Sequence, residues 1–138
     1  MTRALLLDTC AALWIVGGAP IAEPAMDAVI QTHQSGMPLY VSPITAWEIG
    51  LLARKGRFRS ALSPQRWFEE LRKLPGVQLC DLSPEILIAS SFLPGQLHFD
   101  PADRIIAATA RDRGLILMTR DRALLDYAAE GHLTALAC

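Results

Sequence analysis

The sequence has few cysteines and no spaced set of metal-binding cysteines or histidines. Its three cysteines, Cys10, Cys80 and Cys138, lie far apart, without Cys-x-x-Cys or Cys/His spacing. Neither a zinc site nor a disulfide framework is indicated, and a reduced, cytoplasmic environment is the expectation. None of the three histidines, His98 included, stands at the spacing of metal ligands, which argues further against zinc.

The chain also lacks a net charge of either sign and a membrane-spanning run. Its 13 Lys and Arg nearly balance 14 Asp and Glu, so any contact with nucleic acid has to be local. The apolar run at 4–19 imitates a secretory signal, but Asp8 interrupts it. An aspartate at the centre of a membrane helix costs roughly 2.5–3.5 kcal/mol. A soluble protein without membrane contact is expected.

A glycine-rich phosphate loop is absent as well. No G-x-G-x-x-G follows the first apolar segment, which excludes a dinucleotide-binding domain. A phosphatase of the haloacid-dehalogenase type needs a second acid two residues after its first, and position 10 is cysteine here. What remains is a chain of 138 residues, 51% of them hydrophobic, which predicts a single domain spanning 1–138.

Short apolar runs alternate with helical patterns along the chain. The expected strands are 4–7, 39–41, 77–82, 115–118 and 132–136. The expected helices are 10–16, 24–33, 44–55, 64–74, 84–92, 101–113 and 122–130. This alternation predicts the α/β class, as a three-layer α/β/α sandwich around a mostly parallel sheet, in which functional residues gather at the carboxyl ends of the strands.

Acidic residues stand at several element boundaries. Asp100 and Asp103 flank Pro101 at the start of the 101–113 helix, and two acids that merely begin a helix would explain them fully. Asp8 follows the first strand, and Asp121 lies three residues past the 115–118 strand. Both are therefore expected at the same edge of the sheet, although each could be only a helix N-cap.

Glu48 is a carboxylate expected on an apolar helix face. The inward stripe of the 44–55 helix is predicted to hold Ile44, Glu48, Leu51 and Leu52. A buried carboxylate is usually paired, protonated or bound to a metal, and pairing with Arg54 is the structural alternative. With Asp8, Asp103 and Asp121, this predicts four acids at one rim. Carboxylates so arranged either raise one another's pKa or require a cation between them, and a hard divalent cation, Mg²⁺ or Mn²⁺, is the natural one.

Four sequence blocks resemble the signature of PIN-domain ribonucleases, and within that family the VapC-type toxins of toxin–antitoxin pairs. The blocks are LLLDT at 5–9, SPITAWEI at 42–49, HFDPADRIIAATA at 98–110 and LMTRD at 117–121. They occur in the family's order, and the resemblance spans about residues 5 to 127.

The resemblance implies site residues and an activity. It places the family's four acids at Asp8, Glu48, Asp103 and Asp121, as catalytic residues and metal ligands. Thr119 matches the hydroxyl of the T-x-D block, Asp100 matches an acid beside the site, and Cys10 stands where relatives usually have histidine. The implied reaction is Mg²⁺- or Mn²⁺-dependent hydrolysis of RNA by a metal-activated water. The alternative is a PIN-like scaffold that has lost activity and only binds a protein partner.

Basic residues and partners complete the expectations. The densest basic cluster, Arg54, Lys55, Arg57 and Arg59, is either an RNA phosphate grip or the cationic end of a helix. Arg104 is either a phosphate contact or the counter-ion of a carboxylate. The resemblance implies a small antitoxin as partner beside the RNA substrate. Surplus apolar residues on the early helices suggest an antitoxin surface or a homodimer.

Overall fold

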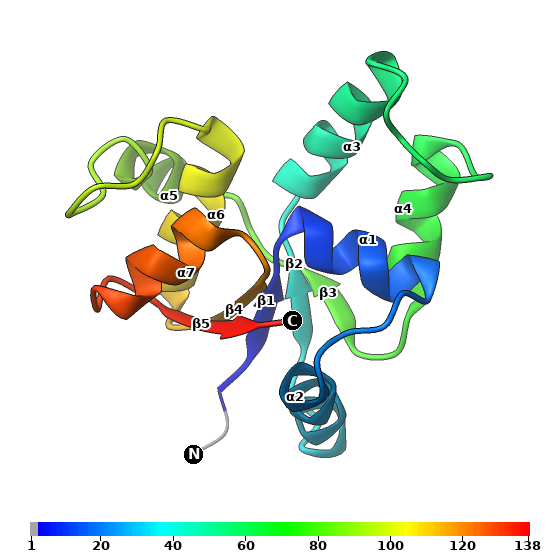
Figure 1. Cartoon of the computed structure of the whole chain (residues 1–138), viewed down its shortest axis with the longest axis horizontal. Helices are drawn as coiled ribbons and strands as arrows, with labels where there is room; N and C mark the ends of the chain where they lie inside the picture. Colours follow the sequence, from blue (N-terminus) through cyan, green and yellow to red (C-terminus); the bar gives the residue numbers. More distant parts are fainter. Residues whose placement is uncertain (1–2) are drawn as a thin grey trace.

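The fold is seen in a computed structural model, which describes residues 3–138. Five strands form one sheet: β1 (Leu5–Leu7), β2 (Leu39–Val41), β3 (Val77–Leu79), β4 (Ile116–Thr119) and β5 (Thr134–Ala137). Their order is β3-β2-β1-β4-β5, and every neighbouring pair is parallel. The predicted α/β class and mostly parallel sheet are confirmed, and within residues 3–138 the sheet is entirely parallel (Figure 1).

The apolar runs form strands that are buried on both faces. In β1, Leu5 and Leu7 belong to one hydrophobic core, while Leu6 belongs to the core on the opposite face. The same alternation holds in β4, where Met118 joins the first core and Leu117 the second. Because successive side chains of a strand point to opposite faces, a continuous apolar run is what a doubly covered sheet requires.

Seven helices flank the sheet within residues 3–138. They are α1 (Thr9–Gly17), α2 (Glu23–Gln34), α3 (Ile44–Arg54), α4 (Pro64–Lys73), α5 (Pro84–Ala89), α6 (Pro101–Arg113) and α7 (Arg122–Ala129). Ala11, Ala25, Ile49 and Leu71 bring α1 to α4 into the first core. On the other face, Ile106 of α6 and Leu124 of α7 fill the second core, and α5 packs on α6. The predicted three-layer sandwich is therefore confirmed.

The strand order creates a topological switch point. From β1 the chain first moves to β2 and β3, then returns to the other side of β1 to form β4 and β5. Leu7 pairs with Met118 at the carboxyl ends of these two central strands. Ligands of open parallel sheets bind outside the carboxyl ends of the strands at such a point. The fold thus directs attention to the residues that follow Leu7 and Thr119.

Several boundaries predicted for the second half of the chain differ from the observed ones by one to three residues. The third strand ends at Leu79 rather than at position 82, and α5 ends at Ala89 rather than at 92. The last two strands begin later than predicted, at Ile116 and at Thr134. Thr119 therefore belongs to β4, and Asp121 lies two residues past its end. Between residues 3 and 138, no helix is long and apolar enough to span a bilayer.

Candidate metal centre

Asp8 is the most enclosed acid at the switch point. It follows β1 directly, is only 4% exposed, and caps α1 because its Oδ1 accepts a hydrogen bond of 2.7 Å from the Ala11 amide. Its Oδ2 accepts a hydrogen bond of 2.5 Å from the Thr119 hydroxyl. Burial is the largest influence on this carboxyl and raises its pKa, which the two hydrogen bonds oppose. Asp8 is thus both a helix cap and a site carboxylate held at a fixed position.

Thr119 connects Asp8 to Asp121. The Thr119 side chain is fully buried, and its hydroxyl oxygen accepts a hydrogen bond of 2.9 Å from the Asp121 amide while donating to Asp8. Asp121 in turn caps α7 by accepting from the Leu124 amide at 2.9 Å. One hydroxyl therefore fixes two of the predicted site acids relative to each other.

Asp103 is the acid with the strongest electrostatic perturbation. Asp100 caps α6 by accepting from the Asp103 amide at 3.1 Å, so Asp103 lies in the first helical turn, directed toward the same rim. Desolvation and then the neighbouring acids Asp100, Asp121, Glu48 and Asp8 raise the pKa of Asp103 to about 7. A helix N-terminus by itself favours a charged carboxylate, whereas burial and the neighbouring acids favour the protonated form of Asp103.

Glu48 reaches the rim from α3, but not on the predicted helix face. The buried residues of α3 are Thr45 and Ile49, so the stripe predicted through Ile44 and Glu48 is wrong by one residue. Glu48 lies half-buried beside that stripe, and its Oε1 accepts a hydrogen bond from the Thr9 hydroxyl. Burial raises the pKa of Glu48, with smaller contributions from Asp100 and Asp8. Its partner is therefore Thr9, not Arg54.

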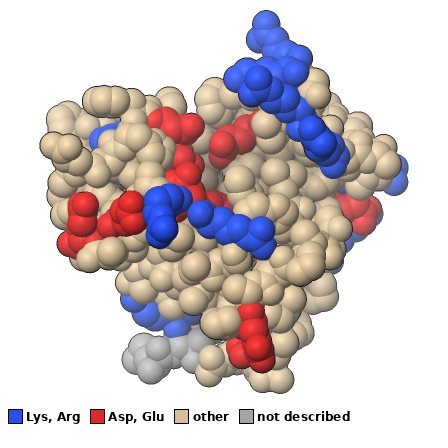
Figure 2. Space-filling model, viewed as in Figure 1, with Lys and Arg blue, Asp and Glu red and all other residues tan. Residues whose placement is uncertain are grey.

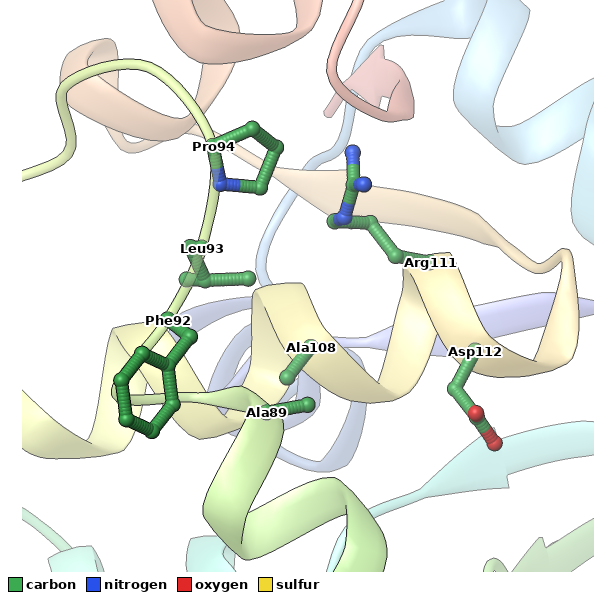
Figure 3. A pocket seen from close by; sticks show the side chains of 7 residues that line it. All are labelled: Ala89, Phe92, Leu93, Pro94, Ala108, Arg111 and Asp112. Atoms are coloured by element: carbon green, nitrogen blue, oxygen red, sulfur yellow. The ribbon is translucent and has the colours of Figure 1, made fainter.

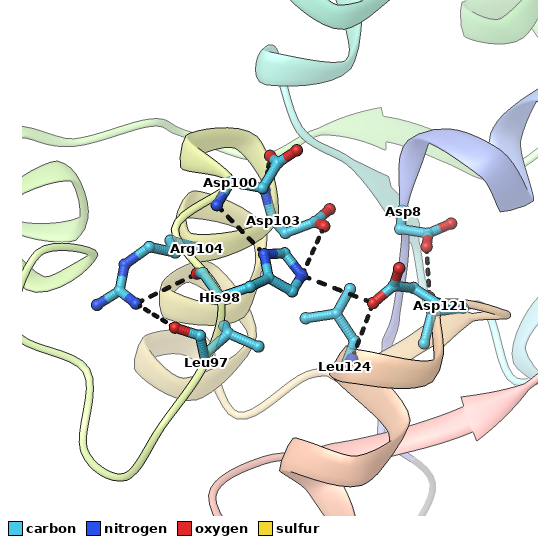
Figure 4. A network of polar contacts seen from close by, with 9 residues as sticks. Asp8, Leu97, His98, Asp100, Asp103, Arg104, Asp121 and Leu124 are labelled. Carbon is cyan, nitrogen blue, oxygen red and sulfur yellow. Dashed lines mark hydrogen bonds and ion pairs between the residues drawn. The ribbon is translucent and has the colours of Figure 1, made fainter.

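His98 is a member of the site that the sequence did not reveal. Its Nε2 lies 3.2 Å from Asp103 Oδ2 and 3.8 Å from Asp121 Oδ2 (Figure 4). His98 has no metal-ligand spacing in the sequence, and the fold nevertheless brings its ring to two of the site acids. The ligand atoms of His98, Asp103 and Asp121 all lie within 4.8 Å of one another, close enough to surround one cation. Sequence spacing could not show this, because the three residues come from a loop, a helix and a post-strand turn.

The negative charges of these acids also affect the thiol of Cys10. Burial, followed by Asp8, Glu48, Asp103 and Asp121, raises the pKa of this thiol to about 11. Without a metal, the thiol therefore stays protonated at neutral pH. The rim is richest in carboxylate oxygens, which are the donors that Mg²⁺ or Mn²⁺ prefers. The residues present fit a hard divalent cation.

A groove continues from the acids along α3. It has a volume of about 410 Å³ and is lined by Thr9, Cys10, Leu13, Trp47, Glu48, Leu51, Leu52, Lys55, Arg57, Asp100, Pro101 and Ala102. Figure 2 shows acidic side chains in the hollow between the two upper parts of the molecule and basic side chains at the upper right. Arg54 and Arg57 are exposed and, within residues 3–138, form no ion pair. They are free to contact an anion.

Arg104 contacts backbone carbonyls. Its guanidinium donates from Nε to the Ser90 carbonyl at 2.9 Å and from Nη1 to the Leu97 and His98 carbonyls at 2.9 Å and 3.4 Å. These contacts contradict the expectation of a carboxylate counter-ion, and the phosphate contact stays a prediction. Arg104 instead ties the loop that carries His98 to α6.

A second hollow lies on the α5–α6 side. It has a volume of about 300 Å³ and is lined by Ala89, Phe92, Leu93, Pro94, Ala108, Arg111 and Asp112 (Figure 3). Arg111 donates to the His132 carbonyl, and Asp112 is the single carboxylate in the lining. This hollow therefore lacks the converging acids that distinguish the rim at β1 and β4.

Comparison with known proteins agrees with this fold. The PIN domain family matches residues 5–130, nearly the whole chain, and the protein belongs to that family. It is similar to Ribonuclease VapC22 of Mycobacterium tuberculosis, with 30% identity over 127 residues, which are 92% of this chain and 93% of that protein.

Two solved structures share the fold. VapBC2 from Rickettsia felis, bound to a DNA fragment from its promoter, superposes with a TM-score of 0.67 and 15% identity, covering 97% of this chain and 98% of that one. DNA-bound VapBC from Salmonella typhimurium gives a TM-score of 0.67 and 19% identity, covering 98% of each chain. At these identities the likeness concerns the arrangement of helices and strands.

Proposed function

We propose that this protein is an Mg²⁺- or Mn²⁺-dependent endoribonuclease. The observation that carries the proposal is the convergence of Asp8, Glu48, Asp103 and Asp121, from four segments, at the switch point of the parallel sheet. Their mutual repulsion contributes to the pKa of Asp103, raised to about 7 by burial and the other acids. Membership of the PIN family and similarity to a protein named as a ribonuclease support RNA as the substrate.

We assign different roles to the four acids according to their surroundings. Asp8 and Asp103 would hold the cation, since Thr119 and Ala11 fix the Asp8 carboxylate and Asp103 lies in the first turn of α6, facing the same rim. A bound Mg²⁺ would supply a Lewis acid that offsets charge on the phosphoryl group and increases the acidity of a water molecule. Glu48 and Asp121 would orient the attacking water or hold a second ion.

Surrounding residues maintain this arrangement. Thr119 fixes the spacing of Asp8 and Asp121, Thr9 orients Glu48, and Asp100 fixes the start of the helix that carries Asp103. Arg57, which lines the groove, and Arg54, at the end of α3, would bind RNA phosphates beside the scissile bond. No covalent intermediate is required, because the chain supplies acids and no activated nucleophile at the rim.

The direct test is cleavage of RNA by the purified protein with and without EDTA. We expect cleavage in Mg²⁺ or Mn²⁺, none in excess EDTA, and none by Asp103→Asn, which keeps the shape of the side chain. Asp126→Asn on the exposed face of α7 is the matched control and should cleave like wild type. Cleavage that continues in EDTA would exclude the metal mechanism. A folded wild-type protein that cleaves no RNA would favour the inactive scaffold.

We further propose that the protein is the toxin of a toxin–antitoxin pair and acts in the cytoplasm. The similarity to proteins named VapC22 and VapBC supports this role. Expression of the chain alone should slow bacterial growth, and co-expression of a small antitoxin encoded beside it should restore growth. Expression of Asp103→Asn at the same level should be harmless. Undiminished growth with folded wild-type protein would contradict the toxin role.

Exposed apolar side chains support contacts with other protein chains. Ile88, in the last turn of α5, is 63% exposed, Phe92, three residues past its end, is 80% exposed, and Phe99 is 92% exposed. Trp47 on α3 is 50% exposed. We therefore retain a homodimer, beside the antitoxin complex, as the expected assembly. Sedimentation of the purified chain tests it, and a monomer at micromolar concentration would contradict it.

A further inference from the structure

His98 has two ring nitrogens with different partners. Its Nδ1 accepts a hydrogen bond of 3.2 Å from the Asp100 amide. A nitrogen that accepts a hydrogen bond carries no proton, so in the neutral ring the hydrogen resides on Nε2. The loop geometry thus selects one tautomer of His98.

The other nitrogen faces the acids of the site. Nε2 lies 3.2 Å from Asp103 Oδ2 and 3.8 Å from Asp121 Oδ2 (Figure 4). With its hydrogen on Nε2, the ring has no lone pair there for a metal ion and presents its donor to Asp103 at 3.2 Å. One oxygen of the carboxylate that would hold a cation therefore already lies beside a protein donor.

The backbone around His98 is fixed. Arg104 donates to the carbonyls of Leu97 and His98 itself, and Asp100 begins α6 immediately afterwards. The ring therefore cannot move away by displacement of the loop without breaking these contacts. Rotation of the side chain is the motion that remains for freeing Asp103.

We propose that His98 is a positioning residue that competes with the divalent cation for Asp103 and does not bind the cation itself. This inference rests on the proposed metal centre. In the protein without metal, the Nε2–H group of His98 is the donor for Asp103. A cation that binds Asp103 has to displace this donor, which lowers the affinity for the metal. A hydrogen bond to a charged group is stronger than one between neutral groups, but the side chain of His98 is 34% exposed, which reduces its contribution. We expect competition of about tenfold in affinity.

Isothermal titration of the full chain with Mg²⁺ tests the sign of this effect. His98→Ala removes the donor, so it should bind Mg²⁺ about tenfold more tightly than wild type. His98→Asn keeps an acceptor near the Nδ1 position but no donor near Asp103, so it should also bind more tightly. His98→Gln returns a donor near the Nε2 position and should resemble wild type. His33→Ala, on the exposed side of α2, is the control and should leave the affinity unchanged.

The order of Mg²⁺ affinities among the variants shows whether His98 competes with the cation or coordinates it. If His98 coordinates the cation, His98→Ala and His98→Asn bind Mg²⁺ and Mn²⁺ more weakly than wild type, and that order overturns the proposal while leaving the metal centre intact. Absence of Mg²⁺ binding by every variant overturns this proposal and the metal centre together. Melting in EDTA verifies that each variant is folded.

Nitrogen NMR of the His98 imidazole provides a readout that is independent of RNA cleavage and of the calorimetric Mg²⁺ titration. In EDTA, the His98 signals should show a protonated Nε2 and an unprotonated Nδ1. Addition of Mg²⁺ should change the environment of the Nε2 hydrogen while that nitrogen stays protonated. An Nδ1-protonated ring, or loss of the Nε2 proton when Mg²⁺ binds, would contradict the assigned role.

Discussion

Thr119 donates its hydroxyl hydrogen to Asp8 Oδ2 over 2.5 Å, although 111 positions separate the two residues in the chain. The same hydroxyl accepts from the Asp121 amide. Because Thr119 and Asp8 are both buried, neither group can exchange this partner for bulk water. The hydroxyl of β4 therefore determines where the carboxylate at the end of β1 lies.

Thr119→Val should remove the hydrogen bonds of the hydroxyl to Asp8 and to the Asp121 amide while preserving the shape of the side chain. We expect a loss of about 1–3 kcal/mol in the free energy of unfolding, since a buried carboxylate and an amide both lose a partner. RNA cleavage should fall as well. Urea unfolding and a cleavage assay measure the two effects. Thr119→Ser keeps the hydroxyl and is the control; equal behaviour of both variants would show that the hydroxyl is dispensable.

Asp103 should make stability fall as pH rises. Its pKa is about 7 in the folded protein against a usual 3.8, so the folded state retains a proton that the unfolded chain has lost. The stabilisation is complete below about pH 4 and disappears as the pH approaches 7. In EDTA, Asp103→Asn should therefore melt higher than wild type at pH 8, with a smaller difference at pH 5.

Bound Mg²⁺ should stabilise wild type more than Asp103→Asn. Mg²⁺ at about 100 times its Kd should stabilise wild type by roughly 2.7 kcal/mol, and the variant should lose most of this shift. If Asp103 only begins a helix, Asp103→Asn should melt lower than wild type and keep the Mg²⁺ shift. Melting curves at both pH values, with Mg²⁺ and with EDTA, distinguish these possibilities.

Arg54 and Arg57 should contribute to RNA affinity by binding phosphates. Removal of one arginine that binds a phosphate reduces the slope of log affinity against log salt by about 0.7 for a single strand. The double substitution to alanine should lower the slope by about 1.4, measured in EDTA so that no RNA is cut. Arg72→Ala, on α4, is the matched control. A slope that does not change would leave the cluster as the cationic end of a helix.

Arg104, unlike Arg54 and Arg57, should contribute to the stability of the fold and not to RNA affinity. Arg104→Met removes the donor that serves the Ser90 and Leu97 carbonyls, so the free energy of unfolding should fall by about 1–3 kcal/mol. The salt dependence of RNA binding in EDTA should stay at the wild-type value. A variant with full stability and a smaller salt slope would instead identify Arg104 as a phosphate contact.

The sequence contained enough information for the architecture and for the location of most of the rim. The apolar run Leu5–Leu7 predicted a doubly buried strand, and Asp100 with Pro101 predicted the start of α6 at the residue where the structure has it. These signals are local: strand burial, proline geometry and capping depend on neighbouring residues. The position of Asp8 follows from such signals plus the rule that parallel strands end at one edge.

The failures concern contacts between segments. The stripe of α3 was misplaced because Thr45 is buried against the Thr9 hydroxyl, and a polar pair inside the fold is invisible to hydrophobic periodicity. His98 was missed because its partners, Asp103 and Asp121, approach it only after folding. The role of Arg104 depends on which carbonyls the loop leaves without donors. None of these features has a spacing that a single sequence displays.

The pairing of Asp8 with Thr119 has a consequence for the order of events during synthesis. Thr119 is synthesised 111 residues after Asp8, which at about 5–20 residues per second is a delay of roughly 6–22 seconds. Until then Asp8 lacks its hydroxyl donor, and β1 can pair with β2 but not with β4. A nascent chain that has not reached β4 therefore cannot assemble the rim.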